Sequence, residues 1–126
     1  MNSIFTKIID REIPAHIVFE DEYTLAFLDI NPVQPGHTLV VSKLEVNHLQ
    51  DLDDEHYTAL MMTVKRLATH FKHVLGTERV CLKVEGFDVQ HVHVHLIPAN
   101  TAAEFKAEPT TADPEDLEAM AQRLRP

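Results

Sequence analysis

The sequence has little of what would connect it to an oxidising compartment or a membrane. Its 126 residues include a single cysteine, Cys81, so an intrachain disulfide is impossible, which is typical of a reducing environment. The N-terminal stretch MNSIFTKIIDREIP has charges among its apolar residues and lacks the apolar core of a signal peptide. No apolar run approaches the length of a membrane span. We therefore predict a cytoplasmic protein with no membrane partner.

Basic residues are also scarce. The chain has 11 Lys and Arg against 20 Asp and Glu, which gives a formal net charge of −9. Binding to a nucleic-acid backbone needs clustered Lys and Arg, so this balance argues against a nucleic-acid partner. A small phosphate-bearing ligand is still compatible with it, because a local pocket can oppose the overall charge.

The remaining composition is that of an ordinary globular protein, with 44% apolar and 25% charged residues. The chain contains no internal repeat, low-complexity segment or Gly/Ser-rich linker. We predict a single domain over residues 1–126, in which residues 110–126 form a C-terminal helical tail.

Hydrophobic periodicity predicts the order of the elements. Apolar residues recur at spacings of three and four between residues 51 and 75, which predicts one long helix that ends before Gly76. Shorter helices are predicted over residues 3–10 and from Pro114 onward. Strands are predicted over residues 17–21, 24–30, 37–43, 79–86 and 91–98. This order predicts an α+β fold with a five-stranded, mainly antiparallel sheet.

The stretch HVHVHLIP, residues 91–98, places histidines at alternate positions of an apolar run. Residues two apart share one face of a strand, so we expect His91, His93 and His95 to project together into a cleft or solvent. The apolar residues between them are expected to pack under the long helix, beside Val80, Leu82 and Val84.

Three interpretations of the histidine row are open at this point. The first is a solvated sheet face without function. The second is a metal site completed by His37, although the outer histidines are about 13 Å apart and one ion hardly reaches all three. The third is phosphoryl chemistry, in which one imidazole attacks phosphorus and a neighbour assists the leaving group. The third interpretation uses every histidine.

HVHVHLIP resembles the signature of the histidine triad (HIT) proteins, in which three histidines alternate with apolar residues. The upstream stretches FLDINP and PGHTLVVSK also resemble Hint-like and other bacterial HIT hydrolases, and the similarity covers all but about the last thirty residues. The transferase branch of that superfamily carries Gln at the third triad position, so His95 favours the hydrolase branch. The resemblance implies the HIT fold, nucleotide hydrolysis at an α-phosphate, and a homodimer.

The resemblance also implies roles for individual residues. His93 matches the nucleophile that forms a covalent nucleotidyl-histidine, and His95 matches the residue that assists the leaving group. His91 matches the histidine that orients the nucleophile, partly through its main chain. His37 matches an upstream histidine that completes the hydrogen-bonded cluster. This mechanism requires neither a cofactor nor a metal.

A nucleotide pocket follows from the same resemblance. Asp29 matches the carboxylate that accepts hydrogen bonds from the ribose hydroxyls, and Phe27 shares its face. The other positions matched to the pocket are Ile4, Phe5, Ile8, Ile30, Leu39, Asp88 and Val89. For Ile8 and Leu39, plain core packing is an equally open interpretation.

One segment departs from the family pattern. VEGFDVQHVHVH is shorter than in many relatives, Phe87 stands where Gln is expected, and residues 79–90 contain no Asn. The phosphate cradle must then be made partly of backbone N–H groups. We predict a hydrolase of purine nucleoside phosphoramidates, adenylates or dinucleoside polyphosphates. The alternatives are a nucleotide- or partner-binding module with vestigial activity and a metal-dependent hydrolase.

Overall fold

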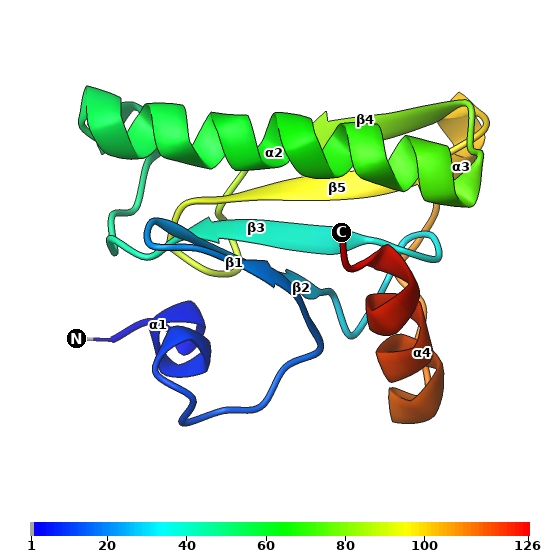
Figure 1. Ribbon diagram of the computed structural model, residues 1–126, viewed down its shortest axis with the longest axis horizontal. Helices are drawn as coiled ribbons and strands as arrows, with labels where there is room; N and C mark the ends of the chain where they lie inside the picture. Colours follow the sequence, from blue (N-terminus) through cyan, green and yellow to red (C-terminus); the bar gives the residue numbers. More distant parts are fainter. Residues whose placement is uncertain (1) are drawn as a thin grey trace.

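The computed structural model describes residues 2–126 and contains one antiparallel five-stranded sheet with the order β1-β2-β3-β5-β4 (Figure 1). The strands are β1 (Ile17–Glu20), β2 (Thr24–Leu28), β3 (Thr38–Ser42), β4 (Arg79–Lys83) and β5 (His93–Ala99). The helices are α1 (Ile4–Ile9), the 3₁₀ turn η1 (Leu49–Asp51), α2 (Asp54–Leu75), α3 (Ala102–Phe105) and α4 (Pro114–Leu124). The predicted α+β fold, with a five-stranded antiparallel sheet and one long helix, is confirmed.

Helix α2 runs along the sheet and covers one of its faces (Figure 1). It begins at Asp54 instead of residue 51, because η1 precedes it and the Asp53 side chain caps it by accepting from the His56 N–H. Gly76 ends it with φ 68°, a left-handed conformation that suits glycine. The stripe of α2 and the apolar side of α4 share one buried cluster with Val40, Val94 and Leu96 of the sheet and with Val92, which precedes β5.

Helix α1 lies on the opposite face of the sheet. Its Phe5 and Ile8 pack in a second buried cluster with Leu25, Phe27, Leu39 and Val41. Alternation along β5 therefore sends Val94 and Leu96 toward α2, and His93 and His95 toward the α1 side. Since α1 is only six residues long, it leaves part of this face uncovered. That uncovered part is where the candidate site lies.

The burial predicted for the strand over residues 79–86 is wrong at two residues, Leu82 in β4 and Val84 just after it. Val80 packs against the α2 cluster as expected, but Leu82 and Val84 are 47% and 45% exposed. The reason is that β4 is an edge strand, and the apolar cluster under α2 does not extend to its C-terminal half.

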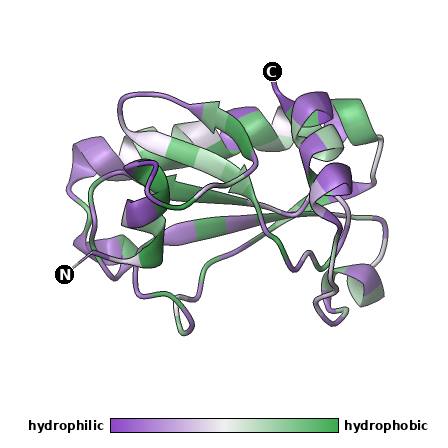
Figure 2. Cartoon of the chain, turned by 90° about the horizontal axis from the view of Figure 1, so that it is seen from below, coloured by the Kyte–Doolittle hydropathy of each residue, from purple (hydrophilic) through white to green (hydrophobic). Residues whose placement is uncertain are grey.

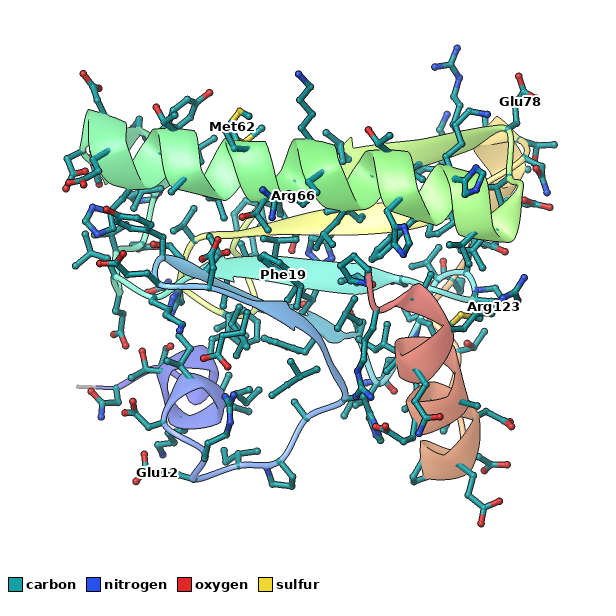
Figure 3. All side chains as sticks on the ribbon, in the orientation of Figure 1. Glu12, Phe19, Met62, Arg66, Glu78 and Arg123 are labelled. Atoms are coloured by element: carbon teal, nitrogen blue, oxygen red, sulfur yellow. The ribbon has the colours of Figure 1, made fainter. Side chains whose placement is uncertain are left out.

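Outer surfaces of the helices carry polar residues, whereas the strands are largely apolar, as Figure 2 shows by hydropathy. Arg66 on α2 reaches over the ring of Phe19 on β1, with its guanidinium carbon 5.6 Å from the ring centroid (Figure 3). Within residues 2–126, no helix combines the length and the apolar character that crossing a membrane requires.

Candidate functional site

A cavity of about 580 Å³ opens between α1, the ends of β2 and β5, and the segment before the triad. Its volume lies in the range of small-molecule sites. His93 and His95 contribute to its wall. So does every residue that the sequence predicted for nucleotide contact, namely Ile4, Phe5, Ile8, Phe27, Asp29, Ile30, Leu39, Asp88 and Val89.

The other two predicted catalytic residues lie behind this wall. His37 is 3% exposed, and its Nε2 lies 2.9 Å from Nδ1 of His95. His91 is fully buried on the same side of the sheet as His93, with the ring of Phe5 packed against both. The expectation that His91 faces a cleft or solvent is wrong. β5 begins only at His93, and the His91 side chain instead bonds to Ser3 and Ser42.

Backbone contacts assign the tautomers of His37 and His95. The Val33 N–H can only donate, so Nδ1 of His37, 3.0 Å away, must accept. A neutral His37 then carries its proton on Nε2 and donates to Nδ1 of His95. Consequently, a neutral His95 carries its own proton on Nε2, the nitrogen that remains for the cavity. Gly36, with φ 88°, makes the turn that brings His37 into this position.

A second backbone contact assigns the tautomer of His93. Its Nδ1 lies 2.6 Å from the carbonyl oxygen of His91, which can only accept, so Nδ1 carries a proton. In the neutral ring, the lone pair is then on Nε2. The rings of His93 and His95 are 4.9 Å apart between centroids and edge to face. The cavity thus receives a nucleophilic nitrogen beside an N–H donor.

Burial keeps two of these imidazoles neutral. The pKa of His95 is lowered to about 3, first by burial and then by the positive charges of His93, His37 and Lys83. Burial likewise lowers the pKa of His37, although the nearby Asp29 carboxylate opposes this effect. Both rings are therefore uncharged at neutral pH, as the tautomer assignment requires.

Asp29 is held at the cavity by the chain around it. Its Oδ1 accepts from the Asn31 N–H at 2.8 Å, and its backbone N–H donates to the His37 carbonyl at 3.0 Å. Oδ2 lies 3.7 Å from Nε2 of His37. A carboxylate fixed in this way can accept hydrogen bonds from a pair of neighbouring hydroxyl groups.

Asp29, His37 and His95 also bring three ligand atoms within 4.8 Å of one another, close enough to suggest a cation. A metal at Nε2 of His37 would require the proton to move to Nδ1, where it would face the Val33 N–H. The donor pattern around His37 thus suits a hydrogen-bonded pair of imidazoles better than a metal.

Comparison with known proteins identifies the family. Residues 10–102 match the HIT domain. The chain belongs to the HIT family. It is 44% identical over 98 residues to the adenosine 5′-monophosphoramidase of Saccharomyces cerevisiae, an alignment that covers 75% of this chain and 61% of the yeast protein. It is 35% identical over 105 residues to the purine nucleoside phosphoramidase of Escherichia coli K12, covering 75% of this chain and 85% of that protein.

Solved structures agree with the HIT assignment. A HIT-like protein of Bartonella henselae, described as involved in cell-cycle regulation, superimposes with a TM-score of 0.88 at 32% identity, covering 98% of this chain and 94% of the other. A zinc-bound histidine triad protein of Mycobacterium smegmatis has a TM-score of 0.83 at 28% identity, covering 99% and 91%.

The segment before the HIT triad makes the cavity acidic. Glu85 and Asp88 contribute to the wall together with Asp29, and no Lys or Arg does so among the described residues. Phe87, the departure from the family pattern, is 86% exposed and lies outside the cavity wall. It therefore does not fill the space that a phosphate would need.

A second cavity, of about 610 Å³, lies on the other side of Asp29 and His37. Residues 32–36 and the C-terminal segment between residues 107 and 120 form most of its wall. None of the three triad histidines contributes to it. We place the chemistry in the first cavity for that reason.

Sequence reasoning missed several residues around the site. His16, which no motif assigned to the site, lines the first cavity and contacts Glu118 on α4 at 3.1 Å. Ser3 and Glu45, which support His91, carried no signal at all, because they are polar residues 88 and 46 positions away from it.

Proposed function

We propose that this HIT protein is a nucleotide hydrolase that cleaves at the α-phosphate of purine nucleoside phosphoramidates or related adenylates. One observation carries the proposal. His93 presents a lone pair on Nε2 and His95 presents a proton on Nε2, side by side at the wall of a cavity that apolar residues of α1 also line. A nucleophile next to a hydrogen-bond donor is what displacement at phosphorus requires.

In the proposed reaction the purine lies among the apolar residues near α1 and the ribose hydroxyls bond to Asp29. His93 Nε2 attacks the α-phosphorus and forms a covalent nucleotidyl-histidine. The leaving nitrogen departs with the electron pair of the broken bond and takes up a proton from solvent water, while the N–H of His95 donates a hydrogen bond to it. Water then attacks phosphorus, regenerates His93 and releases the nucleoside monophosphate.

The acidic wall bears on which leaving group is favoured. Glu85 and Asp88 disfavour the several negative charges of a polyphosphate, because like charges in a shared cavity repel. A phosphoramidate or an acyl adenylate brings only one charge at the α-phosphate. We therefore rank phosphoramidates and adenylates above dinucleoside polyphosphates, in line with the phosphoramidase names of the yeast and E. coli relatives.

The test is the release of AMP by purified protein from adenosine 5′-phosphoramidate and, in parallel, from a diadenosine polyphosphate, both in the presence of a chelator. The proposal expects faster release from the phosphoramidate and no effect of the chelator. Loss of activity on chelation would favour the metal-dependent hydrolase instead.

The second candidate function is a nucleotide-binding or partner-binding module with vestigial activity. It is favoured by the pre-triad segment, where Phe87 points away from the cavity and the side chains that do line it are acidic or apolar. Tight AMP binding with negligible turnover of all these substrates would support it.

We also propose that the chain forms a homodimer through the edge strand β4. Leu82 and Val84 leave apolar surface beside the unpaired edge, and Phe87, 86% exposed, follows them. An antiparallel copy of the same strand would pair the free backbone groups and cover these side chains. The cytoplasmic location favoured by the single cysteine stays a prediction.

A further inference from the structure

Three segments of the chain that are distant in sequence meet at the N-terminus of α1. Ser3 Oγ lies 2.6 Å from Nδ1 of His91. The Ser3 N–H donates to Oε1 of Glu45 at 2.9 Å, and the Thr6 hydroxyl donates to the same oxygen. We call Ser3, Thr6, Glu45 and His91 the α1 anchor.

The direction of each hydrogen bond in the α1 anchor is determined. The Ser42 carbonyl can only accept, so His91 carries a proton on Nε2, 2.7 Å away. Burial lowers the pKa of His91, which leaves Nδ1 as an acceptor. The Ser3 hydroxyl therefore donates to His91 while it accepts from the Thr6 N–H at 3.0 Å as the cap of α1.

The α1 anchor leads directly to the nucleophile. The carbonyl oxygen of His91 accepts from Nδ1 of His93 and so determines which way that ring turns. Next to Glu45, the Val46 carbonyl accepts from the Val92 N–H at 2.8 Å and holds the same stretch of backbone. The ring and the main chain of His91 are thus restrained from α1 and from the segment that follows β3.

We propose that Ser3 and Glu45 are positioning residues for His93. Ser3 holds the ring of His91, and Glu45 holds Ser3, so that the His91 carbonyl stays in place to orient the nucleophile. Neither residue contacts the cavity. The inference rests on the proposed function, because it takes His93 as the nucleophile.

Substitutions at Ser3 separate positioning from helix capping. Alanine removes both the cap and the contact with His91, whereas glycine removes the contact but is a nearly equivalent cap. Threonine keeps both. We expect Ser3→Ala and Ser3→Gly to lower kcat alike, by about tenfold, with little change in KM, and Ser3→Thr to restore most of the activity.

Glu45 offers a matched pair of variants. Glu45→Gln keeps an oxygen that accepts from Ser3 and Thr6, and we expect it to retain most of the activity. Glu45→Ala removes the acceptor and should lower kcat as Ser3→Gly does. If Ser3→Gly has wild-type kcat, or if the losses simply follow the stability of each variant, the positioning role is wrong.

A second readout does not depend on turnover. In protein with ¹⁵N-labelled histidine, the Nδ1 resonance of His91 should leave its hydrogen-bonded position in Ser3→Gly and keep it in Ser3→Thr. An unchanged resonance in Ser3→Gly would overturn the inference. If the His91 resonance changes in Ser3→Gly as expected but the wild-type protein hydrolyses no phosphoramidate, the α1 anchor is supported and the proposed function is refuted.

Discussion

The backbone N–H of Val33 donates to Nδ1 of His37 over 3.0 Å, and this contact decides where His95 carries its proton. Because the Val33 N–H can only donate, it determines the tautomer of His37. The tautomer of His37 then determines that of His95. The carbonyl of His91 determines the tautomer of His93 in the same way. Two main-chain groups thus leave a lone pair on Nε2 of His93 and a proton on Nε2 of His95.

The donor role of His95 predicts a dependence on the leaving group. His95→Ala should slow cleavage of a phosphoramidate with an amine leaving group by roughly 10²–10³-fold, the usual cost of removing a hydrogen bond to developing negative charge. Cleavage of an adenylate ester with a good leaving group, such as a nitrophenol, should slow far less. The measurement is kcat/KM for both substrates, with His73→Ala, an exposed position, as the control. Equal losses for the two substrates would contradict the donor role.

Asp29 predicts selectivity for an intact ribose. Asp29→Asn keeps the acceptor for the Asn31 N–H but removes the charge, so AMP binding should weaken by roughly tenfold or more. Binding of 2′,3′-dideoxy-AMP should hardly change. Calorimetric titration of both ligands tests this, and Asp10→Asn at the exposed end of α1 is the matched control. A similar weakening for both ligands would remove the ribose role.

Buried histidines predict a loss of stability in mild acid. Burial lowers the pKa values of His37, His91 and His95 below the unfolded value near 6.5. The unfolded state therefore binds more protons below that pH, so the free energy of unfolding is highest above about pH 6.5 and falls as the pH drops. Each histidine contributes up to about 1.4 kcal/mol per pH unit.

Urea unfolding between pH 7.5 and 5 measures this slope. His95→Gln removes one titrating group and should flatten it, whereas His73→Gln, at an exposed position, should not. A free energy of unfolding that is constant over this range would show that these rings are not buried in the neutral form.

The proposed homodimer through the edge strand β4 can be tested by substitution. Leu82→Glu would place a charge in the proposed interface. We therefore expect the wild-type protein to be a dimer and the Leu82→Glu variant to be a monomer. Light scattering after gel filtration gives the mass directly. Leu44→Glu, at another exposed leucine outside β4, is the control and should leave the dimer intact. A wild-type protein that is monomeric at all concentrations would end this proposal.

The features that could be predicted from the sequence depend on residues close together in the chain or on short motifs. The apolar stripe of α2 depends on helical periodicity, and Gly76 on its left-handed conformation, so both were found where they were expected. The cavity residues around Asp29 and Phe27 were found through family motifs, and for Ile8 and Leu39 core packing was an equally open interpretation of the sequence.

What the sequence could not predict depends on packing between distant segments. The contact of Ser3 with His91 joins residues 88 positions apart, and no periodicity encodes it. The exposure of Leu82 follows from the position of β4 at the edge of the sheet, which alternation along one strand does not reveal. The tautomer of His95 depends, through His37, on the backbone N–H of Val33. Every residue except proline has such a group, so the sequence does not mark it.

The central claim is covalent catalysis by His93, and the most direct test is the intact mass of the protein after it is mixed with adenosine 5′-phosphoramidate and quenched rapidly without acid. We predict a transient adduct of one adenylyl group together with AMP release. Both should be absent in His93→Ala, which should still bind AMP because the residues proposed to contact the purine and the ribose are other residues of the cavity wall. An adduct or wild-type turnover in His93→Ala would contradict the assignment of the nucleophile. Wild-type protein that binds AMP but gives neither adduct nor product would contradict the hydrolase itself.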